Sequence, residues 1–233
     1  LVYEKRGSAP QLLVSSSGIE YALSSYLQKQ GMISDPPPPE SPGRAEQMII
    51  MAGSCAPTTG KQIDWIKEKG FEPIRIDTVK LIEPESRNGE MERVTRQAGK
   101  ILSDGKNVVI FTAVGPGDPA IRTTKDKMHE LQLPEGSTSE GISKAQGKIL
   151  LEILSNTGNV PRVVVAGGDT SGYVSLELGI HALEVLMPIA PGAPLCLAHS
   201  KDPRFDGMEI SLKGGQNGKA RYFESVFEGT ALE

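Results

Sequence analysis

The chain has 233 residues, of which 38% are apolar and 23% are charged, a composition typical of an ordinary globular protein. Its formal net charge of −4 excludes the broad basic surface that non-specific nucleic-acid binding needs. The sequence also lacks the run of about 18 apolar residues that a membrane-spanning helix needs. We therefore expect neither a nucleic-acid nor a membrane partner, and we expect any bound phosphate to be held locally by backbone N–H groups and a few cations.

The predicted elements alternate between strands and helices along most of the chain. A short strand over 11–15 and a helix over 18–30 come first. A linker over 33–44 follows, because its four consecutive prolines forbid both a helix and a central strand. Apolar runs then predict buried strands over 47–52, 107–112 and 161–166, and residues 73–77 are expected to form another strand. Periodic segments predict helices over 58–69, 89–104, 139–155 and 171–183.

Polar residues over 122–137 predict a loop, and the last part of the chain is rich in strands, over 185–190, 194–198 and 208–213. Short apolar strands separated by helices indicate a sheet covered on both faces, with the helices serving as parallel crossovers. We therefore predict an α/β fold with a three-layer, mixed, mostly parallel sheet. We assign residues 1–45 to a hinge segment and linker, and 46–233 to the main domain.

The start of the chain and its cysteines bear on its origin. The sequence begins with Leu1 rather than Met, and its first ten residues resemble no signal peptide, so it is interpreted as starting within a longer protein. Cys55 and Cys196 make one disulfide arithmetically possible, but we predict two free thiols of a reducing, cytoplasmic compartment.

Three loops follow predicted strands, where open α/β sheets bind ligands. The first is Gly53–Thr59, in which Ser54 offers a hydroxyl and the next helix N-terminus favours an anion; a plain capping turn fits equally well. The second contains Gly167, Gly168, Asp169 and Thr170, which suit phosphates, with Asp169 accepting from a ribose or holding hydrated Mg²⁺.

The third loop is Lys213–Lys219, in which Gly214, Gly215 and two lysines suit a triphosphate. Taken alone, a flexible hairpin turn with solvated lysines explains this loop better. A fourth loop, Gly115–Asp118, is interpreted as a structural turn. No GxxxxGK[ST] or GxSxG motif occurs. The histidines show no metal spacing, so we predict no structural zinc site and assign no residue as a direct metal ligand.

Five segments, in order, resemble the four-carbon acid sugar kinases: VSSSGIEYAL (14–23), MAGSCAPTTGKQI (51–63), VVVAGGDTSGYV (163–174), APGAPLC (190–196) and ISLKGGQNGKARYF (210–223). They match the family's hinge and its GSxSxxTxxQI, AGGETSG, PGxP and KSGNFG motifs. Some members have also been labelled Hrp-dependent type III effector proteins, although nothing in these residues supports secretion.

The resemblance implies a C-terminal α/β domain that binds ATP with Mg²⁺, and an N-terminal domain that binds threonate, erythronate or a 3-oxo-tetronate. The DDxTGA motif of that N-terminal domain does not occur here, so residues 1–233 are expected to be the nucleotide half alone, with the general base in the absent half. Carried over by position, Ser54, Gly167–Thr170 and Gly215 are nucleotide contacts. A homodimer is compatible with the resemblance.

The chain also departs from the family's motifs. Asp169 replaces a Glu, Ala56 a Ser, Gly214 a Ser and Asn217 a Phe. These departures keep open a second hypothesis, a non-catalytic nucleotide-binding or effector-like interaction module. An isolated kinase half is expected to bind nucleotide without turnover, whereas such an interaction module need not bind nucleotide at all.

Overall fold

The computed structural model describes residues 3–4, 7, 12–16, 18–34, 39–134, 136–158 and 160–231. They fall into two compact units, residues 1–38 and 39–233. The first unit contains helix α1 (Gly18–Lys29), which confirms the helix predicted over 18–30 and buries none of its residues. The strand predicted over 11–15 is wrong in its described part, because Leu12 and Val14 are exposed and no strand forms there. Most of the proline run lies outside the described residues.

The second unit is built on one seven-stranded sheet with the strand order β2-β3-β1-β4-β7-β6-β5. The strands are β1 (Met48–Ala52), β2 (Glu72–Arg75), β3 (Val108–Phe111), β4 (Arg162–Ala166), β5 (Ile180–Ala190), β6 (Ala193–Ser200) and β7 (Glu209–Lys213). The helices are α2 (Pro57–Glu68), α3 (Thr78–Ile82), α4 (Pro84–Ser103), α5 (Pro119–Glu130), α6 (Ser137–Asn156), α7 (Gly168–Glu177) and α8 (Tyr222–Glu228).

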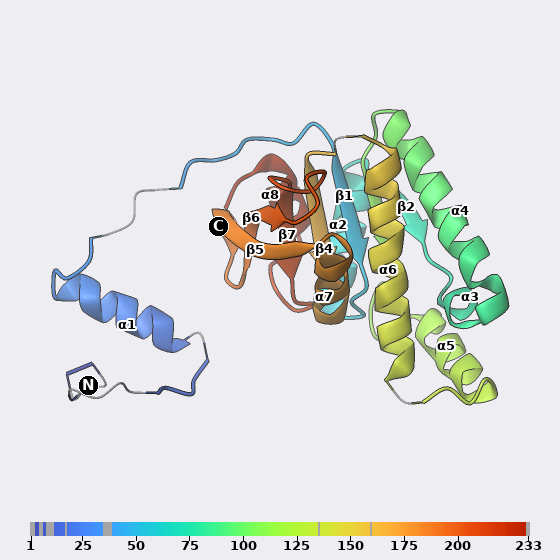
Figure 1. The fold of residues 1–233 in the computed structure, drawn as a ribbon, viewed down its shortest axis with the longest axis horizontal. Helices are drawn as coiled ribbons and strands as arrows, with labels where there is room; N and C mark the ends of the chain where they lie inside the picture. Colours follow the sequence, from blue (N-terminus) through green and yellow to red (C-terminus); the bar gives the residue numbers. More distant parts are fainter. Residues whose placement is uncertain are drawn as a thin grey trace. The chain divides into compact units, whose positions relative to one another are not determined.

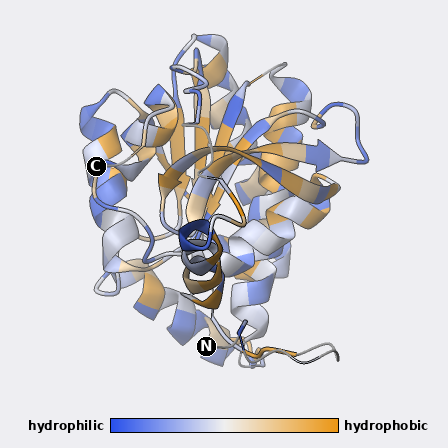
Figure 2. Cartoon of the chain, turned by 90° about the vertical axis from the view of Figure 1, so that its left-hand side faces the viewer, coloured by the Kyte–Doolittle hydropathy of each residue, from blue (hydrophilic) through white to orange (hydrophobic). Residues whose placement is uncertain are grey.

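Strands β2, β3, β1, β4 and β7 pair in parallel, and β6 and β5 add an antiparallel edge. Every residue of β1 and β4 is buried, because both faces of the central strands are covered by helices. Figure 2 shows these central strands as the most hydrophobic part of the unit. The predicted three-layer, mostly parallel α/β fold is confirmed.

Two hydrophobic cores lie on opposite faces of the sheet. One packs α3, α4, α6 and α7 against the sheet, and the other packs α2 and α8 against its opposite face. Helices α4 and α6 lie side by side, and α5 lies next to α3 (Figure 1). This arrangement brings the N-terminal ends of α2, α6 and α7 to the side of the sheet that carries the C-terminal ends of the parallel strands.

Several predictions of local structure were wrong. Helix α5 occupies most of the segment predicted as a loop over 122–137, because it buries only Thr124 and so lacks an apolar periodicity. The predicted helix over 171–183 ends at Glu177, and β5 begins at Ile180. Helices α3 and α8 were not predicted, because five and seven residues are too few to show a period.

The second unit begins before the predicted boundary at residue 46. The Ser41 hydroxyl donates to the Gly229 carbonyl (2.6 Å), and the Ala45 N–H donates to the Phe227 carbonyl (2.9 Å). The end of the predicted linker therefore packs against the C-terminal helix. Among the described residues, no helix is long and apolar enough to cross a membrane.

Candidate functional site

Three loops meet where β1, β4 and β7 end. Strand β1 lies between β3 and β4, so β2 and β3 are added on one side of β1 and β4 is added on the other. Open α/β sheets form a ligand-binding crevice at such a switch point. The backbone N–H groups of Gly53 and Ser54 donate to the Ala166 carbonyl at 2.9 and 3.1 Å. The Gly167 N–H donates to the Lys213 carbonyl at 2.9 Å. The structure thus brings together the three loops singled out from the sequence.

Three of the glycines are needed for this close packing. A Cβ at Gly53 would overlap the Thr170 hydroxyl, and a Cβ at Gly215 would overlap the Ser54 hydroxyl. Gly167 has φ of 127°, a backbone conformation that side chains rarely adopt, and a Cβ there would lie 3.2 Å from the Ser54 nitrogen. These positions are glycine because one loop packs against the next.

Gly168 differs, because a Cβ built on it would meet no atom within 4 Å. It is exposed and is the first residue of α7, a ten-residue helix whose free N–H groups favour an anion. Asp169 is also exposed and accepts a hydrogen bond from the Ser139 hydroxyl (3.1 Å). Thr170 is buried, and its hydroxyl donates to the Gln146 side chain (3.1 Å). The open side of the loop is thus formed by Gly168 and Asp169.

Lys213 lies underneath its glycine loop rather than on it. Its side chain is 2% exposed, and its ammonium donates to the Thr59 hydroxyl (3.2 Å) and the Gly215 carbonyl (3.5 Å). The rings of Tyr222 and Phe223 lie 5.8 and 5.9 Å from the Lys213 nitrogen. Burial lowers the pKa of Lys213 to about 8. The alternative of a hairpin turn with solvated lysines is therefore wrong for Lys213.

Helix α2 fixes the β7 loop through side chains that the sequence analysis did not single out. The Thr59 hydroxyl donates to the Gly215 carbonyl (2.9 Å), and the Gln62 amide donates to the carbonyls of Asn217 and Lys219 (3.0 Å each). Thr59 and Gln62 are fully buried. They occupy the Thr and Gln positions of GSxSxxTxxQI, so that motif was the signal that could have identified them.

Two of the departures from the family's motifs, Gly214 and Asn217, lie next to each other. The Asn217 amide donates to the Pro191 carbonyl (3.1 Å), and its side-chain oxygen lies 2.7 Å from where a Cβ on Gly214 would be. A serine at 214 would therefore clash with Asn217 as it is placed here. Because glycine at 214 makes room for the asparagine, the loop remains anchored without the phenylalanine.

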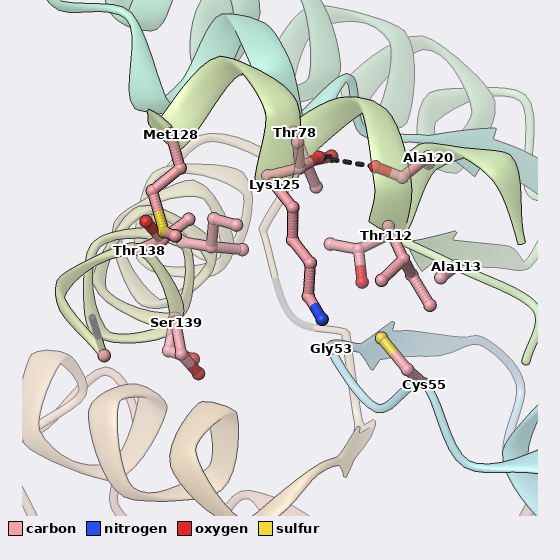
Figure 3. Close-up of a pocket in the computed structure, with 15 residues that line it drawn as sticks. Gly53, Cys55, Thr78, Thr112, Ala113, Ala120, Lys125, Met128, Thr138 and Ser139 are labelled. Atoms are coloured by element: carbon pink, nitrogen blue, oxygen red, sulfur yellow. Dashed lines mark hydrogen bonds between the residues drawn. The ribbon is translucent and has the colours of Figure 1, made fainter. Parts of the chain in front are cut away.

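A pocket of about 420 Å³ opens beside the β1 loop (Figure 3). It is bounded by the ends of β1 and β3 and by helices α3, α5 and α6. Its lining includes Gly53, Cys55, Thr112, Ala113, Lys125, Met128, Thr138, Ser139 and Ile142. This pocket could not be predicted from the sequence, because one of its walls is helix α5, which the sequence analysis did not predict.

Cys55 stands at the mouth of the pocket with its sulfur directed into it (Figure 3). Desolvation, and then the Asp118 carboxylate, raise the pKa of the Cys55 thiol. It is therefore a neutral thiol rather than a reactive thiolate at neutral pH. Cys55 and Cys196 are both free, as predicted. Within the described residues, no group of three or more His, Cys, Asp or Glu side chains could hold a metal ion.

The Gly115–Asp118 loop has a structural explanation. Asp118 accepts two hydrogen bonds from the Arg75 guanidinium (3.0 and 2.7 Å) and one each from the N–H groups of Val114 and Ala120. The bond from Ala120 is the one that caps the N-terminus of α5. These contacts, led by Arg75, hold the pKa of Asp118 well below its usual range. The carboxylate is fully engaged, which supports the interpretation as a turn.

Comparison with known proteins places these loops in a family context. Residues 49–223 match the model of a family described as the nucleotide-binding C-terminal domain. A 3-oxo-isoapionate kinase of Paraburkholderia graminis is 37% identical over 98% of this chain and 48% of its own length. A 3-oxo-tetronate kinase of Pseudomonas savastanoi pv. phaseolicola is 27% identical over 93% of this chain and 46% of its own length.

Solved structures show the same fold. A Haemophilus influenzae protein superimposes with a TM-score of 0.61 at 22% identity, over 90% of this chain and 46% of that one. A Bordetella bronchiseptica protein, described as a domain-swapped dimer with bound citrate, gives 0.61 at 13% identity over 82% of this chain and 43% of that one. The chain thus spans about half the length of the curated relatives it matches.

Proposed function

The chain belongs to the family of nucleotide-binding C-terminal domains, and we propose on that premise that it binds ATP for a kinase of four-carbon sugar acids. The observation that carries the proposal is the meeting of three glycine loops at the ends of β1, β4 and β7. Backbone N–H groups at such a position hold phosphates without needing a broad basic surface.

Two features of the loops support a triphosphate as the ligand. Gly168 leaves open space at the N-terminus of α7, where the helix dipole favours an anion. Ser54 lies between the β4 and β7 loops, and Lys213 supplies a cation from below Gly215. We propose that Ser54, Gly167, Gly168, Asp169, Thr170, Gly214 and Gly215 form the nucleotide contacts.

We propose Mg²⁺ as the accompanying ion because of Asp169. This carboxylate is exposed in the first turn of α7, the same turn that would face a phosphate. Two anions so close repel each other unless a cation lies between them. Mg²⁺ is commonly held by one or two carboxylates together with substrate phosphates, so a single Asp169 fits this arrangement.

The acceptor in the proposed reaction is a sugar acid of the threonate, erythronate or 3-oxo-tetronate type. The names of the relatives support this class. Because the relatives are about twice as long, we propose that the sugar acid and the general base belong to the other half of a full-length kinase. The isolated chain should then bind ATP or ADP with Mg²⁺ but show negligible turnover. Robust phosphorylation of threonate by residues 1–233 alone would contradict this division.

The alternative, a non-catalytic interaction module, was suggested by the changes at 214 and 217. The accommodation of Asn217 by Gly214 removes much of that argument, because the loop keeps its anchors on α2. Calorimetric titration with MgATP separates the two functions. Saturable binding supports the kinase half, and a folded chain without binding at millimolar nucleotide supports the module.

A further inference from the structure

We propose that the pocket between α5, α6 and the end of β1 binds the nucleoside part of the nucleotide, with the base against its apolar walls. This inference rests on the proposed function. The pocket's volume of about 420 Å³ lies in the range usual for small-molecule sites. Its position and its chemistry carry the argument.

The pocket is continuous with the loops proposed to hold the phosphates. Gly53 and Cys55 of the β1 loop form part of its wall. Ser139, on α6, also lines the pocket, and its hydroxyl donates to Asp169 at the start of α7. A molecule with its phosphates on the β1 and β4 loops therefore has the pocket next to it.

The chemistry of the lining suits an uncharged flat ring. The apolar part of the wall comes from Ala113, Ile121, Met128 and Ile142. The remaining lining groups include hydroxyls, and none of the lining residues is a carboxylic acid. A base that is apolar on its faces and polar at its edges matches this combination, because apolar walls with a few placed polar groups are typical of ligand pockets.

The hydroxyls are not equally available to a ligand. The Thr78 and Thr124 hydroxyls bond to each other (2.5 Å), and Thr124 also bonds to the Ala120 carbonyl. The buried Thr138 hydroxyl has no hydrogen-bond partner in the described part of the structure. Because a buried hydroxyl without a partner is costly, a ligand atom that reached the Thr138 hydroxyl would relieve that cost.

Lys125 marks the boundary between the base and the phosphates. Its side chain extends from α5 across the pocket, with its nitrogen directed toward Gly53 and Cys55 (Figure 3). A cation in that position lies on the side of the pocket nearest the phosphate loops. We therefore expect Lys125 to face the ribose and the first phosphate rather than the base.

The test compares ATP with inorganic tripolyphosphate, both with Mg²⁺, by calorimetry on the wild-type chain. If the pocket takes the nucleoside, ATP should bind about tenfold more tightly than tripolyphosphate, or better, because only ATP buries apolar surface there. Equal affinity for the two ligands would overturn the inference while leaving the phosphate site intact. Binding of neither ligand would instead refute the proposed function.

A filling variant then locates the effect. Ile142→Trp should lower ATP affinity about tenfold and leave tripolyphosphate binding within about twofold, because the added ring occupies only the pocket. Lys148→Trp, on the exposed side of the same helix, is the matched control and should change neither. Unchanged ATP affinity in a folded Ile142→Trp chain would contradict the inference. Met128→Trp, which fills the pocket from α5, serves the same test if the first variant does not fold.

Discussion

Replacing Lys213 with methionine should make the protein more stable and its nucleotide binding weaker. Lys213 is buried, and within the described part of the structure it has two acceptors, the Thr59 hydroxyl and the Gly215 carbonyl, at 3.2 and 3.5 Å. Burial lowers its pKa from 10.5 to about 8, so the folded state holds the charged form at a cost. Methionine has a similar length and no charge, and Thr59 keeps its own bond to Gly215.

The pKa difference sets the size of the effect. A fall from 10.5 to about 8 corresponds to about 3 kcal/mol of unfavourable free energy while the lysine is charged in both states. The variant loses two hydrogen bonds worth ~1 kcal/mol each, so the net gain in unfolding free energy at pH 7 should be about 1 kcal/mol. Between pH 8 and 10.5 the unfolded chain holds more protons than the folded chain. Wild-type stability from this group should therefore rise with pH across that window.

Urea unfolding at pH 7 and pH 10 measures both effects. The Lys213→Met chain should be more stable at pH 7 and should lack the part of the pH dependence that Lys213 causes. Its affinity for MgATP should fall about tenfold, because a cation near the phosphates is lost. Lys148→Met, an exposed lysine, is the control and should change stability little. A Lys213→Met chain that is less stable than wild type at pH 7, or that keeps the same pH slope, would refute the reasoning.

Three further substitutions test the loops around the site. Gly168→Val should keep the melting temperature and abolish nucleotide binding in calorimetry, because a Cβ at this position meets no protein atom within 4 Å and the added side chain enters the space left for phosphate. Unchanged affinity would remove this loop from the site. Gly215→Ala should lower both stability, by about 1–3 kcal/mol, and affinity, because the new methyl overlaps the Ser54 hydroxyl; a wild-type denaturation curve would contradict this. Asp118→Asn should lower the free energy of unfolding by about 1–3 kcal/mol at pH 7, because it weakens the bond to Arg75. The lowered pKa of the Asp118 carboxylate gives the wild type stability that is lost as the pH falls. The variant should therefore lose less stability than the wild type on acidification below pH 4. Acid unfolding curves that differ by a constant amount at every pH would oppose it.

The central strands and the loops after them could be predicted from the sequence. The apolar runs at β1, β3 and β4 are continuous, so they indicate strands buried on both faces and place the glycine loops at strand ends. Helix α5 could not be found from periodicity, because it buries only Thr124. Its start was nevertheless marked by Asp118 before Pro119, a capping residue followed by a proline in the first turn. The polar composition of the whole segment, however, favours a loop over a helix.

Contacts between distant segments were beyond the sequence analysis. Thr59 and Gln62 hold a loop more than 150 residues further along the chain, and nothing local to α2 indicates this partner. The burial of Lys213 was equally hidden, since a lysine beside glycines resembles a solvated turn. For residues 12–15 the error is the opposite one, because a strand was predicted where none forms. An apolar run forms a strand only where a partner strand can pair with it.

Calorimetric titration of the folded chain with MgATP, alongside Gly168→Val, tests the central proposal most directly. The structure predicts saturable binding at one site by the wild-type chain and none by the variant, with both chains melting at the same temperature. Two results would contradict the assignment of the nucleotide site to these loops. One is a folded wild-type chain that shows no binding heat at millimolar MgATP, and the other is a variant that binds MgATP as the wild type does.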